Sequence, residues 1–290
     1  MTTLKHLYQQ IIDAMGVDSL KIPTTAVKFY RHDDIIPDQV LAHRPTSITL
    51  TSCQAVKQAS LGDAVLLTLD NIGCVAAAIS LGLVDQDQDV PLCGSRVYTD
   101  LMQGKSEQAE KFNPPTPQDF TKGLVYAHQA ANRPDFGLFG AEDRGRFKSV
   151  ATAKEAISDM TAIQPAIIKG VFLYDLDFDE IDIIPDVVVC SVRPVELARF
   201  IQAYQHQTGR RVNASMGGLR VVNSDLIVRP YLTQEINVST YCLGARLIAQ
   251  YEANRMGIGL PFHLYELVAQ GLDASKTGYP FPLYPGAADV

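Results

Sequence analysis

Apolar side chains in the N-terminal part of the chain change between helical and strand-like spacing. They recur every three or four residues over 4–15, which predicts an amphipathic helix ended by Gly16. Runs rich in β-branched and aromatic residues predict strands over 24–30 (TTAVKFY), 48–51 (ITLT) and 64–69 (AVLLTL). Helices are expected after the last two strands, one entered at Cys53 and one over 72–81 with Asp70 as its cap.

The C-terminal part shows the same two kinds of pattern. Strands are predicted over 166–173, 187–192 (VVVCSV) and 226–228. Pro194 is suited to the first turn of a helix that runs to about residue 207, and Gly209 is suited to end it. Two more helices are expected, one over 239–253 capped by Ser239 and one from Pro261 to residue 272.

This order of elements defines the expected fold class. Alternating strands and helices favour an α/β protein, with a mixed α+β arrangement as the alternative. We expect an N-terminal half over 1–147 and a C-terminal half over 148–290 that ends in a proline-rich tail, unless the chain forms one compact domain. An IIPD motif follows the apolar runs near 27–30 and 171–174, so the packed halves could be duplicated around a shared cleft.

Composition and charge narrow the classes of function. The chain has 290 residues, 47% of them hydrophobic, and a net charge of −7 from 25 basic and 32 acidic residues. No basic patch favours a nucleic-acid partner. The uncharged run at 75–84 is too short to span a bilayer, and the N-terminus lacks the apolar segment of a signal peptide. We therefore expect a cytoplasmic protein that binds neither membranes nor nucleic acids.

The five cysteines carry the candidate chemistry. Their odd number and the missing signal peptide argue against a disulfide framework, and no CxxC motif occurs. Cys53, Cys74 and Cys242 each fall at a predicted helix N-terminus, where the dipole favours an anion and a lowered thiol pKa. Three such thiolates could hold an iron–sulfur cluster, most simply a 4Fe-4S cluster, with zinc as the alternative metal. Cys93 is the first candidate for a fourth ligand, and Cys190 is expected in the core.

Two function classes follow from these thiols. A cluster held by three thiolates leaves one iron open, which suits a redox or Lewis-acid enzyme acting on a small anionic metabolite. Arg246, four residues after Cys242, could anchor that substrate or form a salt bridge with Glu252 or another carboxylate. A fourth protein ligand would instead suit exchange with an electron-transfer partner. The competing class is a metal-free small-molecule-binding module with buried structural cysteines. In either class the protein could form a homo-oligomer.

Several segments together resemble one known family. These are TTAVKFY, SCQAVKQASLGD, NIGCVAAAISLGL, PDVVVCSVRPVELARFIQAYQHQTG and STYCLGARLIAQYEANRMGIGLPFHLYELVAQGL. They resemble an uncharacterised family catalogued as domain of unknown function 169, which is common in archaea and anaerobic bacteria. The resemblance spans about 24–272 and implies a soluble protein without an assigned reaction. It also implies that relatives can carry a further cysteine near position 223, where this chain has Asn223.

Overall fold

The described residues of the computed structural model are 4–15, 22–45, 50–83, 160–178 and 183–275. Six of their segments form one sheet in the order β2-β3-β1-β4-β6-β5, and every neighbouring pair is antiparallel. The strands are β1 (Thr24–Arg31), β2 (Ala64–Leu67), β3 (Ile168–Asp175), β4 (Val187–Val192), β5 (Asn237–Thr240) and β6 (Met256–Pro261). The fold is therefore mixed α+β, which was the alternative to an alternating α/β arrangement.

Helices accompany the sheet along the described parts of the chain. They are α1 (Leu4–Met15), α2 (Asp38–Leu41), α3 (Ser52–Ala59), α4 (Val75–Ser80), α9 (Pro194–Thr208), α10 (Val221–Asn223), the π-helix η2 (Ser224–Val228), α11 (Arg229–Thr233), α12 (Leu243–Ile248) and α13 (Phe262–Ser275). The sheet takes β1 and β2 from the predicted N-terminal half and its other four strands from the C-terminal half. The predicted boundary at 147 lies outside the described residues, and a cleft shared between halves is not among the features of the described part.

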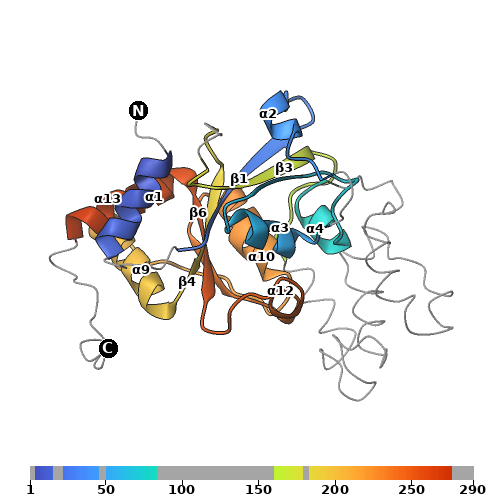
Figure 1. Cartoon of the computed structure of the whole chain (residues 1–290). Helices are drawn as coiled ribbons and strands as arrows, with labels where there is room; N and C mark the ends of the chain where they lie inside the picture. The colour runs from blue at the N-terminus through green and yellow to red at the C-terminus, as the bar shows by residue number, and fades with distance from the viewer. Residues whose placement is uncertain (1–3, 16–21, 46–49, 84–159, 179–182, 276–290) are drawn as a thin grey trace, which may run out of the picture.

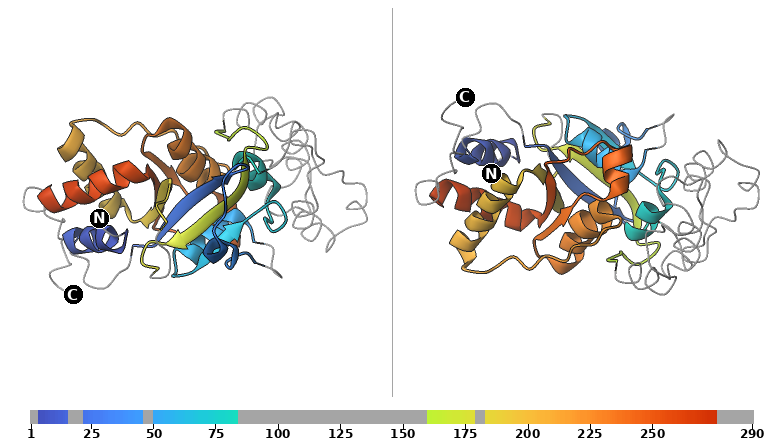
Figure 2. Two further views of the ribbon diagram at one scale, coloured as in Figure 1. Left: turned by 90° about the horizontal axis from the view of Figure 1, so that it is seen from above. Right: turned by 90° about the horizontal axis from the view of Figure 1, so that it is seen from below.

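Two helical layers cover the sheet (Figure 1). Helices α1, α9 and α13 pack on one face, and α3, α4, α10, η2 and α12 pack on the other (Figures 1 and 2). Successive strand residues point to opposite faces. In β1, Val27 and Phe29 accordingly belong to the core cluster on the face of α3, whereas Ala26 and Tyr30 belong to the cluster on the face of α1. Burial on both faces explains why the central strands read as continuous apolar runs.

Several predicted elements are confirmed. Helix α1, strand β4 and the start of α9 have the expected bounds, and Gly209 ends α9 with the positive φ of 68° that a glycine cap supplies. Strands β1, β2 and β3 match within a few residues. The strand predicted over 48–51 is represented only by Leu50, which forms an isolated parallel bridge with Ile72, while 46–49 lie outside the described residues.

One predicted strand and two predicted helix starts are wrong, each for a local physical reason. The apolar run 226–228 is part of η2, not a strand, because it packs as a helix directly on β6. Ser239 belongs to β5, so the helix expected from 239 begins only at Leu243 with Cys242 as N-cap. Asp70 forms an ion pair with Arg44, and the following helix begins at Val75 with Cys74 as N-cap.

The packing of η2 on β6 is unusually close. A Cβ atom built on Gly259 would overlap the backbone carbonyl of Leu226, and one on Gly257 would overlap the Leu226 side chain. Only glycine lets the two backbones approach in this way. The contact fixes η2, and with it the preceding helix α10, against the sheet.

No helix within the described ranges is long and apolar enough to cross a membrane.

Candidate metal centre

Cys53 is positioned by a strongly capped helix. The Thr51 side chain accepts a hydrogen bond from the Gln54 amide, and the Gln54 side chain accepts one from the Thr51 amide. This reciprocal capping box fixes the first turn of α3, in which Cys53 is the second residue. Cys53 is half-buried and packs at the margin of the core on this face of the sheet.

Cys74 is brought to the same place by backbone pairing. Leu50, just before α3, forms a parallel bridge with Ile72, and its carbonyl accepts a hydrogen bond of 2.6 Å from the Gly73 amide. The segment that ends in Cys74 therefore runs directly beside the segment that leads into Cys53. Glycine at position 73 leaves the backbone between the bridge and Cys74 without a side chain.

Cys242 enters from the C-terminal part of the chain. It is the N-cap of α12, which packs against α3. Three residues beyond α12, Tyr251 donates a hydrogen bond of 3.3 Å from its hydroxyl to the Cys53 carbonyl, and its backbone amide donates to the Ala245 carbonyl. Tyr251 thus ties α12 to the first turn of α3, and this contact joins residues 198 positions apart.

Cys53 lies close enough to each of the other two thiols to interact with it. Burial raises the pKa of the Cys53 thiol well above its usual range, and the nearby Cys242 and Cys74 sulfurs raise it further. The lowered pKa predicted from the helix N-terminus is therefore wrong for Cys53, because loss of hydration outweighs the helix dipole. Without a compensating cation, Cys53 is a neutral thiol at neutral pH.

A cation that the sequence analysis missed lies beside these thiols. Arg220 donates from Nη1 to the Cys74 sulfur at 3.9 Å, and its charge opposes the rise in the pKa of Cys53. Arg220 precedes α10 in a left-handed conformation with φ of 57°. The Gly-Gly-Leu-Arg sequence at 217–220 was a weak signal for such a turn, but nothing in it indicated proximity to the cysteines.

Asn223, three residues after Arg220, reaches the same region. Its side-chain oxygen accepts a hydrogen bond from the Ser52 hydroxyl, and both residues are buried. Since Ser52 directly precedes Cys53, the position implied by the family resemblance lies next to the first turn of α3. Arg220, the N-cap of α10, thus reaches the Cys74 segment, and Asn223, its last residue, reaches the Cys53 segment.

The other predicted site residues lie elsewhere. Arg246 donates to the backbone carbonyls of Tyr241, Glu252 and Arg255, so in this structure its guanidinium holds the turn after α12. Cys190 is buried in β4 on the opposite face of the sheet, as expected for a core residue, and burial raises its pKa to about 12. Cys93 lies outside the described residues.

Gly244, two residues after Cys242, is loosely packed within the described part of the chain. Apart from its chain neighbours and its own helix backbone, the Cys242 sulfur, 4.0 Å away, is the single described atom within 4 Å of a Cβ built on Gly244. No three His, Cys, Asp or Glu side chains in the described ranges form a group tight enough for a single metal ion. Cys53 is the thiol that lies near both of the others, and Arg220 contacts Cys74.

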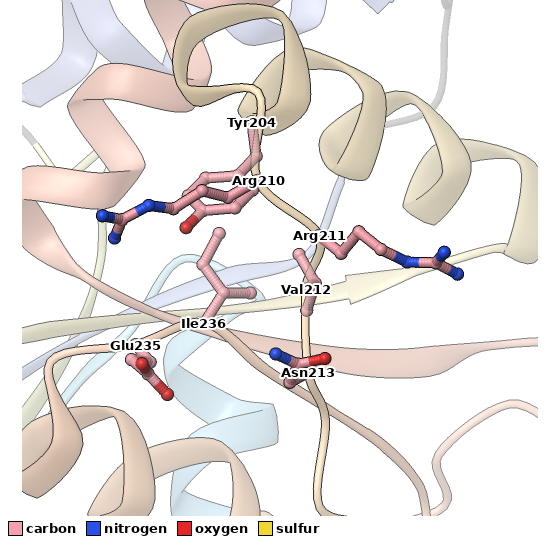
Figure 3. A pocket seen from close by; sticks show the side chains of 7 residues that line it. All are labelled: Tyr204, Arg210, Arg211, Val212, Asn213, Glu235 and Ile236. Atoms are coloured by element: carbon pink, nitrogen blue, oxygen red, sulfur yellow. The ribbon is translucent and has the colours of Figure 1, made fainter.

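A separate cavity of about 370 Å³ lies at the end of α9. It is lined by Tyr204, Arg210, Arg211, Val212, Asn213, Glu235 and Ile236. Arg210 and Arg211 extend in opposite directions (Figure 3). Tyr204, Val212 and Ile236 pack with the α1, α9 and α13 layer, so this cavity lies on the other side of the sheet from the three thiols.

Fold and site together define a mixed α+β protein in which Cys53, Cys74 and Cys242 lie on one face of an antiparallel sheet, with Cys53 near both of the others. The family model described as uncharacterised ArCR matches residues 19–271, and the chain belongs to this family, catalogued as domain of unknown function 169. An uncharacterised protein of Methanocaldococcus jannaschii is 22% identical over 191 residues, 63% of this chain and 81% of that protein. No solved structure matches the chain.

Proposed function

We propose that the chain is an iron–sulfur protein whose cluster is bound by Cys53, Cys74 and Cys242. The observation that carries this proposal is the meeting of three free thiols from three distant segments, with Cys53 interacting with both others. Thiolates hold iron–sulfur clusters, and nothing in such binding requires the ligands to be close in sequence.

The surroundings of the thiols fit an inorganic group. The half-buried Cys53 has lost too much hydration to ionise readily by itself, and a bound cation makes its thiolate favourable. Gly73 and Gly244 remove side chains next to two of the three ligands. Arg220 offsets part of the negative charge that three thiolates would bring.

Three protein thiolates leave a fourth coordination position to another ligand. A 4Fe-4S cluster bound in this way supplies one iron open to a small anionic metabolite, or it exchanges single electrons with a redox partner. Cys93 is the candidate fourth ligand in the second case. Zinc bound by the same thiols is the alternative metal. Free thiols are also consistent with the cytoplasmic location that we propose.

A metal-free binding module is the second candidate. The raised pKa of Cys53 favours it, because a neutral thiol packs as a small apolar side chain without any metal. The cavity beside Arg210 would then be the site for a small anion.

Metal content distinguishes these candidates. Protein purified without oxygen is expected to be brown and to contain about four iron and four acid-labile sulfide per chain. One zinc per chain and no iron would identify the zinc alternative. Colourless protein with no iron, sulfide or zinc, even after chemical reconstitution, would contradict a metal centre and leave the metal-free module.

A further inference from the structure

Among the described residues, Arg220 is the arginine whose guanidinium forms a hydrogen bond to a cysteine sulfur, from Nη1 to Sγ of Cys74 at 3.9 Å. Its backbone is in the left-handed region, at φ of 57°, which is uncommon for a residue other than glycine. Such conformations persist where the surrounding structure holds them. The backbone that carries this side chain is therefore held in place by its surroundings.

The fold holds Arg220 through α10. The Arg220 carbonyl accepts hydrogen bonds from the amides of Asn223 and Ser224, at 3.1 and 3.0 Å. Asn223 in turn accepts from Ser52 in the first turn of α3, and η2 fixes the far end of α10 on the sheet. These contacts connect Arg220 to both the Cys53 and the Cys74 segments, so its distance to the thiols is set by several elements at once.

We propose that Arg220 is a positioning residue that raises the reduction potential of the cluster by donating a hydrogen bond to the Cys74 ligand sulfur. This inference rests on the proposed function, since it needs a bound cluster. One-electron reduction adds a negative charge to the cluster and its thiolates, and no bond to Arg220 forms or breaks. A donated hydrogen bond and a nearby positive charge stabilise that extra charge, so they favour the reduced form.

The test is a redox titration of the anaerobically purified full chain, with dithionite as electron donor and electron paramagnetic resonance as readout. At the potential where wild-type protein is half reduced, Arg220→Met, which removes both the charge and the donor, is expected to lower the ratio of reduced to oxidised cluster about tenfold, which is 59 mV for a one-electron couple. Arg220→Lys, which keeps a charged donor, should fall between the two.

Lys57→Gln is the matched control. Lys57 lies one turn beyond Cys53 on α3 and pairs with Glu252, so its removal changes the local charge without removing a hydrogen bond to sulfur. Its ratio should stay within about twofold of wild type.

Each of the following outcomes would overturn the inference. An Arg220→Met potential equal to that of wild type, or a shift matched by Lys57→Gln, would exclude a specific role of the hydrogen bond while leaving the cluster in place. Loss of iron from both Arg220 variants would assign Arg220 to cluster retention, not to tuning. A wild-type chain that holds no iron would refute the proposed function itself, and this inference with it.

Discussion

Replacing Cys53 by alanine is expected to lower bound iron more than about tenfold in protein purified without oxygen. Mutating residues that only hydrogen-bond to metal ligands already costs about tenfold or more in metal affinity, and the loss of a ligand itself should cost more. Cys53 is the thiol that interacts with both of the others, so replacing it removes both of these thiol pairs. Iron, acid-labile sulfide and visible absorption measured on the same sample report the effect.

Cys190→Ala is the matched control for this variant. Cys190 is also a free cysteine, but it is buried on the opposite face of the sheet. The control should keep its iron while losing about 1 kcal/mol of unfolding free energy through the small cavity that it leaves. Equal iron content in the two variants would contradict the assignment of Cys53 as a ligand.

Gly259→Ala is expected to have the largest effect on stability. Its new Cβ would overlap the Leu226 carbonyl, and a backbone atom cannot move aside by changing rotamer. The variant must push η2 away from β6, and we expect a loss of about 4 kcal/mol or more in unfolding free energy, or failure to fold. Chemical denaturation monitored by circular dichroism measures the loss.

Two other glycines calibrate this prediction. Gly257→Ala meets only the Leu226 side chain, which can partly rearrange, so it should lose clearly less stability. In Gly218→Ala, no described residue other than the chain neighbours comes within 4 Å of the new methyl group, so the variant should stay within about 0.5 kcal/mol of wild type. A Gly259→Ala protein as stable as Gly218→Ala would show that η2 does not depend on this close approach.

Local patterning was enough to predict the strongly periodic elements. The bounds of α1 follow from its apolar spacing, and those of α9 follow from Pro194 and Gly209, because these signals act within a few residues. The apolar run 226–228 could not be distinguished from a strand in this way. Its helical form depends on two glycines in β6, about 30 positions later, that allow the close contact.

The candidate site, too, was predictable from sequence only where the signal was local. Helix-start positions singled out Cys53, Cys74 and Cys242, although two of them prove to be N-caps. That the three segments meet depends on the Leu50–Ile72 bridge and on Tyr251, which are long-range contacts without a local signal. Arg220 was missed for the same reason, and the pKa of Cys53 was misjudged because sequence does not reveal how completely a thiol is enclosed.

Crystals grown without oxygen and measured at the iron absorption edge test the central claim most directly. We expect one compact anomalous peak in contact with the sulfurs of Cys53, Cys74 and Cys242, with Arg220 beside the Cys74 sulfur. An anomalous map with no iron peak, or with a peak away from these three sulfurs, would contradict it.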